Sequence, residues 1–156
     1  MVRDTLNFSR EIFGYRRREL PSLVNLLASA SRTSSASGAD VTSDLIKEAS
    51  ALLLIVNVTA QSGTTPTLDL AIQAKIGTNY VNLARFSQYG AATGLKGINV
   101  KRDLAFSTEL VPASDPAVGS GLLVNNHDLL DTLRAKWLLG GTTPNYTFSV
   151  DIYPIN

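Results

Sequence analysis

The sequence predicts an all-β protein: an antiparallel β-sandwich of jelly-roll type with an N-terminal arm. Short runs of alternating apolar and polar residues are separated by turn residues about every ten positions, which is typical of sandwiches. No long segment with a helical apolar period lies between these runs. A length of 156 residues matches one domain, and 44% hydrophobic residues can fill its core. We therefore expect an arm at residues 1–21 and a sandwich domain at residues 22–156.

The composition excludes several classes of function. The absence of cysteine rules out disulfide scaffolds, thiolate zinc sites, iron–sulfur clusters and cysteine nucleophiles. Fourteen basic residues nearly cancel thirteen acidic ones, so no global field attracts nucleic acid. The N-terminus is charged without an apolar run behind it, and the longest apolar stretch, Ala49–Val58, is too short to cross a membrane. We expect synthesis in the cytoplasm and neither a nucleic-acid nor a membrane partner.

The arm carries five of the fourteen basic residues, interleaved with aromatic side chains. Phe8, Ile12 and Tyr15 recur at spacings of four and three, which fits a short amphipathic helix, although an extended arm fits equally well. The functional interpretation is an element that docks on a partner, and the alternative is a frayed terminus with a solvated charge run. The candidate partner-binding residues are Phe8, Phe13, Tyr15, Arg16, Arg17 and Arg18.

The segment Ser29–Asp44 is rich in serine, threonine and alanine. Its composition resembles a linker, but its alternation favours two modest edge strands joined near residues 35–38.

Two later segments share a Gly-Thr-Thr-Pro motif. Residues 51–60 and 68–72 alternate around Ser62–Pro66, and residues 133–139 and 146–152 alternate around Gly140–Pro144. Each segment predicts an antiparallel hairpin whose turn contains the shared motif. Apolar residues occupy the second, fourth and sixth positions after each proline, so we expect two structurally equivalent hairpins. Weaker strand signals lie at residues 80–86, 98–102 and 104–111, and residues 112–121 are rich in turn residues.

The sequence offers little for catalysis or metal binding. His127 is the only histidine, so a zinc site is nearly excluded and a Ser-His-Asp triad would depend on this residue alone. The aspartates form no spaced calcium-loop motif, and Asp69 and Asp151 fall on the polar strand faces, where a solvated side chain is expected. We expect no enzymatic activity, no catalytic residues, no cofactor and no metal.

At the two motifs the chain resembles a group of small structural proteins of tailed bacteriophages. The resemblance rests on LLLIVNVTAQSGTTPTLDLAIQAKIG, on LRAKWLLGGTTPNYTFSVDIYP and on the preceding LLASASRTSSASGADV, and it covers Leu23 to Tyr153. It implies a β-sandwich component of the virion that commonly lies on or near the capsid and has no enzymatic activity.

The expected function is therefore capsid decoration through the major capsid protein or other virion proteins, with neighbouring copies as further partners in a homo-oligomer. A head-completion, neck or tail protein is the alternative within the same class. A carbohydrate-binding sandwich module is a further alternative, because such modules use exposed aromatic residues. The candidates for that role are Tyr80, Tyr89, Trp137, Tyr146 and Tyr153.

Overall fold

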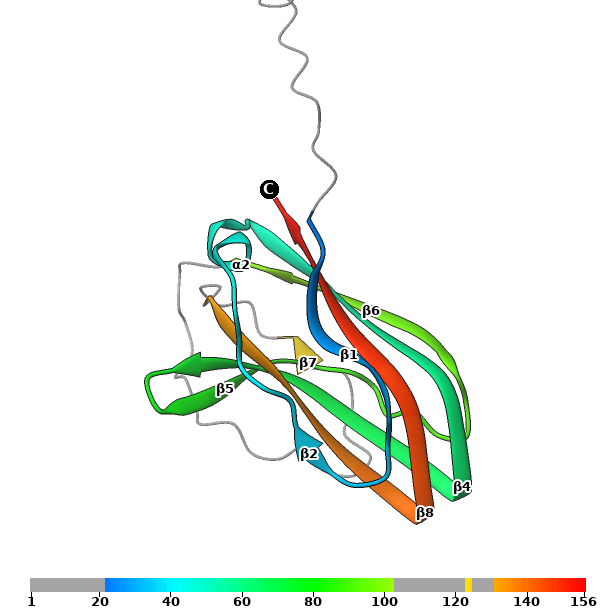
Figure 1. Ribbon diagram of the computed structural model, residues 1–156. Helices are drawn as coiled ribbons and strands as arrows, with labels where there is room; N and C mark the ends of the chain where they lie inside the picture. Colours follow the sequence, from blue (N-terminus) through cyan, green and yellow to red (C-terminus); the bar gives the residue numbers. More distant parts are fainter. Residues whose placement is uncertain (1–21, 103–122, 125–130) are drawn as a thin grey trace, which may run out of the picture.

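The computed structural model describes residues 22–102, 123–124 and 131–156, which form one antiparallel sheet and one short helix (Figure 1). The all-β class agrees with the prediction. The N-terminal arm, His127 and residues 103–122 lie outside the described residues. The elements are β1 (Val24–Arg32), β2 (Ala36–Ser37), β3 (Val41–Thr42), α2 (Asp44–Glu48), β4 (Ala51–Ile76), β5 (Asn79–Arg85), β6 (Gly94–Lys101), β7 (Leu123–Val124) and β8 (Thr132–Ile155).

The two long strands, β4 and β8, pair antiparallel along almost their whole length. The first residues of β4 pair with the last of β8, as in Ala51 with Ile155, and the ladder continues to Ala74 with Leu133. The two predicted hairpins are therefore wrong as pairings: the residues expected to pair across each turn pair with the other segment instead. Local alternation determines which face a residue occupies, but it leaves the neighbouring strand open.

Both long strands bend sharply at their Gly-Thr-Thr-Pro motifs, which lie side by side (Figure 1). Thr64 pairs with Thr142 at this corner. The backbones match, with φ of 117° and 97° at Gly63 and Gly141, and φ of 48° and 49° at Thr65 and Thr143. A ladder can bend only if both of its strands bend at the same level, so the two motifs together form one corner. The expected equivalence of the two segments is thus found in their backbone conformation.

The corner divides the sheet into two parts. The β6 half contains β1, residues 145–155 of β8, residues 51–62 of β4, and β6. The β5 half contains β2, β3, residues 132–140 of β8, residues 67–76 of β4, β5 and β7. The strands β5 and β6 match two of the predicted strands, and β1 to β3 match the predicted edge segments in part.

The core lies between these two halves. Trp137 of the β5 half meets Phe148 of the β6 half edge to face, with ring centroids 5.8 Å apart. The Arg32 guanidinium at the end of β1 lies over both rings, 5.2 Å and 4.3 Å from their centroids. The inward side chains of β4 and β8 form one buried cluster, including Leu52, Leu54, Val56, Val58, Leu68, Leu70, Ile72, Leu133, Ala135, Val150 and Ile152.

Candidate functional site

The predicted partner-binding residues Phe8, Phe13, Tyr15, Arg16, Arg17 and Arg18 all lie outside the described residues. The structure neither brings them together nor separates them. Within residues 22–102 and 131–156, three features remain as candidates for a site: a polar network, a strap between β5 and β6, and the corner.

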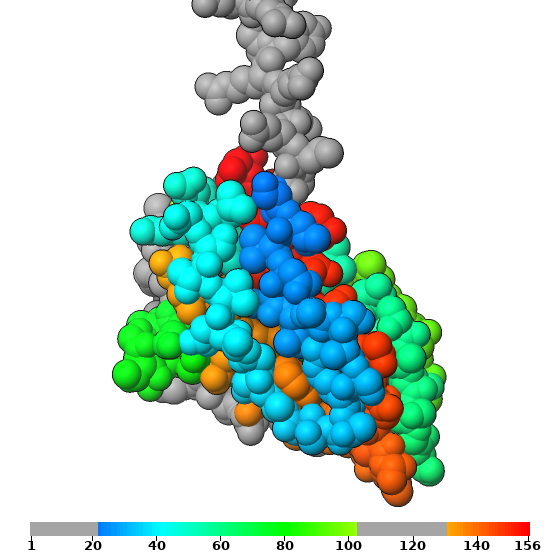
Figure 2. All heavy atoms as spheres, viewed as in Figure 1, coloured from blue at the N-terminus to red at the C-terminus, as the bar shows by residue number. Residues whose placement is uncertain are grey.

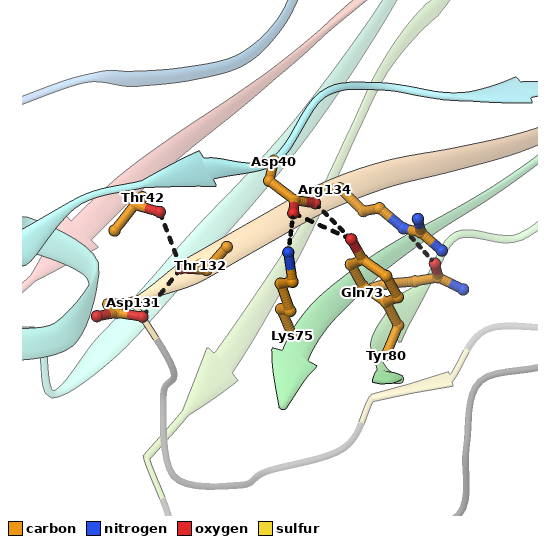
Figure 3. A network of polar contacts seen from close by, with 8 residues as sticks. All are labelled: Asp40, Thr42, Gln73, Lys75, Tyr80, Asp131, Thr132 and Arg134. Carbon is orange, nitrogen blue, oxygen red and sulfur yellow. Dashed lines mark hydrogen bonds and ion pairs between the residues drawn. The ribbon is translucent and has the colours of Figure 1, made fainter. Parts of the chain in front are cut away.

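The polar network joins three strands and the segment before β3 at one end of the β5 half (Figure 3). Asp40, between β2 and β3, accepts hydrogen bonds from Lys75 Nζ at 2.6 Å and from the Tyr80 hydroxyl at 2.8 Å. The Arg134 guanidinium stacks 3.3 Å from the centre of the Tyr80 ring and donates to Gln73 Oε1 at 2.9 Å. The network therefore fastens the segment before β3 to β4, β5 and β8.

The electrostatics of the network indicate a closed ion pair. The hydrogen bond from Lys75 lowers the pKa of Asp40, and the same contact raises the pKa of Lys75. A carboxylate held in its ionised form by a cation is a poor general base at neutral pH. The ion pair thus links the segment before β3 to β4.

Sequence reasoning missed this network, although part of its signal was present. Gly77, with φ of 59°, sits in the turn between β4 and β5, so Lys75 and Tyr80 become a cross-strand pair. That register was readable from the turn. The contact of Asp40 with Tyr80 could not be predicted in this way, because the two residues are 40 positions apart in the sequence and only the fold brings them together.

The strap is formed by residues 87–90, which cross from the β5 half to the β6 half; Tyr89 is its buried residue. Tyr89 exchanges two backbone hydrogen bonds of 2.9 Å with Leu68. Lys96 of β6 donates to the carbonyls of Ser87 and Gln88 at 2.7 and 2.9 Å, and lies 3.9 Å from the centre of the Tyr89 ring. Burial raises the pKa of Tyr89 to about 12 and lowers the pKa of Lys96.

Asp69 differs from the expectation that it is solvated. Its side chain is buried, with 1% of its surface exposed, and Oδ2 accepts a 2.8 Å hydrogen bond from Gln88 Nε2. Asp69 lies on the side of β4 that the alternation assigns to solvent. At this level β8 pairs with β4 on one side, through Leu138, and the strap pairs with it on the other, through Tyr89 and Leu68, while Gln88 of the strap binds the carboxylate. A central strand can thus bury a residue of its polar face. Asp151, in contrast, is partly exposed and accepts a hydrogen bond from Asn25.

Three of the five aromatic candidates for sugar binding are buried. Tyr89, Trp137 and Tyr146 are between 0% and 6% exposed. Tyr80 takes part in the polar network of the β5 half, whereas Tyr153 pairs with Leu53 in the β6 half. The described residues therefore present no shared aromatic platform.

Metal and membrane sites were sought in the same residues. No group of three histidine, cysteine, aspartate or glutamate side chains converges within the described part of the chain. There, too, no helix is long and apolar enough to span a bilayer, since α2 has five residues. No protein-family model matches the sequence, and no curated protein matches it either.

Proposed function

We propose that the chain is a non-enzymatic structural protein of a tailed-bacteriophage virion. In this proposal it decorates the capsid by binding the major capsid protein, and neighbouring copies supply additional contacts. The arm residues Phe8, Phe13, Tyr15 and Arg16–Arg18 form the anchor. Many copies on a symmetric shell would give strong attachment even where each contact is weak.

The observation that carries the proposal is the meeting of the two resemblance motifs at one corner. They are far apart in the sequence, yet their glycines and threonines have matching backbone angles and Thr64 pairs with Thr142. A single structural element explains why both motifs occur together, in the same order, in the phage proteins that this chain resembles. This supports a common architecture and therefore a common role.

A jelly-roll-like β-sandwich is the finer fold assignment that we propose. The edge-to-face contact between Trp137 and Phe148 supports it, because these side chains come from the two halves of one bent sheet. The single core cluster supports it as well, since sandwiches bury the inner faces of two facing layers.

The polar groups favour a rigid structural body over a catalytic one. Asp40 forms an ion pair with Lys75 and accepts a hydrogen bond from Tyr80, and Lys96 donates to carbonyl groups of the strap. These side chains hold strands together, which suits a protein that must keep its shape on a particle. The buried positions of Tyr89, Trp137 and Tyr146 count against the carbohydrate-binding alternative.

The test is the copy number and location of the protein in purified particles of the phage that encodes it, by quantitative mass spectrometry and imaging. Hundreds of copies over the shell are expected for decoration. A dozen or fewer at one vertex would instead support the neck or tail alternative, and none in any particle would refute a virion role.

The anchor is tested separately by deleting residues 1–20. The deletion should abolish particle occupancy, whereas Thr78→Ala, in the exposed turn between β4 and β5, should leave occupancy unchanged. Unchanged occupancy of the deletion variant would refute the anchor.

A further inference from the structure

The outward side of the β6 half carries a group of exposed apolar side chains. Three of the five large hydrophobic residues that are exposed in the described chain lie on it: Leu23, Leu95 and Ile155, with 52%, 65% and 41% of their surface exposed. The outward side of an antiparallel sheet is ordinarily polar. The apolar outer face consists of Leu23, Ala51, Leu53, Ile55, Leu95, Tyr153 and Ile155. Asn57, Asn99, Lys101 and Asp151 lie on the same side of the sheet, at the rim and between these residues.

Four of these residues are direct neighbours across the strands. Leu53 pairs with Tyr153 and Ala51 pairs with Ile155, so their side chains share one face of the ladder between β4 and β8. Gly97 of β6 lies opposite Ile55 and has no side chain; a β-carbon built there would be 3.6 Å from Leu53 Cδ1. Figure 2 shows β1, the end of β8 and the start of β4 side by side on the surface.

The sequence of β4 carries the same signal. Residues 51–56 read ALLLIV, an unbroken apolar run of the kind found in strands that are covered on both faces. The inward side chains Leu52, Leu54 and Val56 are fully buried, while Leu53 and Ile55 remain partly exposed. The apolar outer face is therefore built to be covered.

The size of this face indicates what covers it. Four strands about 4.8 Å apart, over about seven residues, span roughly 20 by 20 Å, or about 400 Å². A stable dimer buries about 800 Å² on each partner, so two copies that stacked these faces together would bury only about half of the area that a stable dimer needs. A single amphipathic helix of about twelve residues is about 18 Å long and about 10 Å wide, and it fits.

We propose that the apolar outer face is the docking site of the chain's own N-terminal arm, residues 1–21. The arm joins the sheet at Ser22, directly before Leu23 of this face, so covalent attachment gives it a high effective concentration there. Phe8, Ile12 and Tyr15 supply an apolar stripe. The face carries one cation, Lys101 opposite Ala51, and one carboxylate, Asp151 opposite Ile55, so apolar contacts and not charge carry the docking.

This docking goes beyond the proposed function and holds whether or not the chain is a virion protein. The same arm side chains are the proposed capsid anchor, so the face and the capsid compete for them. In the free protein the docked arm covers its aromatic residues, and attachment to a partner requires their release.

The test uses the absence of natural cysteine in the full-length chain. Ser9→Cys in the arm is combined with Asn99→Cys, which is exposed and opposite Leu53 on the face. The matched control combines Ser9→Cys with Glu48→Cys, which is exposed on α2 at the same end of the molecule (Figure 1). The rate of intramolecular cross-linking by a short bismaleimide is measured by mass spectrometry.

The face pair should react at least about tenfold faster than the control pair, because docking raises the local concentration above that of a free tether. Adding Phe8→Ser and Tyr15→Ser in the arm, or Leu95→Ser on the face, should remove the preference. Trp137 fluorescence verifies folding of each variant. Equal rates for the two pairs, a preference that survives these substitutions, or cross-links only between chains would overturn the proposal. Since the isolated protein is used, these results are independent of particle occupancy.

Discussion

Replacing Gly141 by alanine should destabilise the protein strongly, because the corner leaves no room for a side chain. Gly141 has φ of 97°, and a β-carbon there would lie 2.5 Å from the Thr65 carbonyl oxygen and 2.8 Å from that of Thr64. These are backbone atoms of the paired strand, so they can give way only if β4 and β8 separate. Gly63 meets the same obstacle from the other strand, 2.7 Å from the Thr143 carbonyl oxygen.

The expected loss of stability in Gly141→Ala is the sum of two contributions. A left-handed backbone costs a residue with a β-carbon about 1–2 kcal/mol. Overpacking that forces a backbone shift costs about 1–3 kcal/mol more. Gly141→Ala should therefore lower the free energy of unfolding by about 2–5 kcal/mol. With a urea m-value of about 2 kcal/mol/M, the unfolding midpoint falls by about 1–2.5 M.

The assay is urea unfolding followed by the fluorescence of Trp137, the single tryptophan, which is 6% exposed in the folded chain. Gly90→Ala is the matched control, because a β-carbon at Gly90 meets nothing within 4 Å. The control should stay within about 0.5 kcal/mol of the parent protein. If Gly141→Ala lost no more stability than Gly90→Ala, the proposed close contact of the two motifs would be wrong.

Three further predictions concern other contacts. Thr143 is β-branched and has a φ of 49°, a conformation that asparagine tolerates better than threonine. Thr143→Asn should therefore raise the free energy of unfolding by about 0.5–1 kcal/mol. A thermal unfolding midpoint below that of the parent protein would contradict this. The Arg32 guanidinium donates hydrogen bonds to the carbonyls of Ala28, Ala30 and Phe148 and stacks on the Phe148 ring. Arg32→Lys should therefore lower the free energy of unfolding by about 1–2 kcal/mol. An unchanged urea midpoint would show that the planar guanidinium is dispensable. Burial raises the pKa of Tyr89 to about 12, above its value of about 10 in the unfolded chain, so the folded state keeps a proton that the unfolded state loses. Stability from this residue is therefore complete below about pH 10 and falls as the pH rises towards 12. The urea midpoint of Tyr89→Phe should fall less than that of the parent protein over this range, and equal losses would refute the assignment.

Sequence alone determined the strand class and the facing of most side chains. Alternation placed Leu54, Leu70, Trp137 and Phe148 inside, and all four are buried. The shared Gly-Thr-Thr-Pro motif predicted two equivalent hairpins; the hairpin pairings are wrong, but the two motifs do share their backbone conformation, with matching φ values at Thr65 and Thr143. These features depend on local geometry, because the period of two and the glycine positions act within a few residues.

Only the tertiary structure decided which strands are neighbours. A tight hairpin closes the shorter loop and is therefore the natural expectation from sequence. The corner instead keeps each strand hydrogen-bonded to its distant partner, as in Leu70 with Trp137, while both strands bend together. The burial of Asp69 and the contact of Asp40 with Tyr80 follow from that choice of neighbours. Both depend on residues far away in the chain, so no local pattern could encode them.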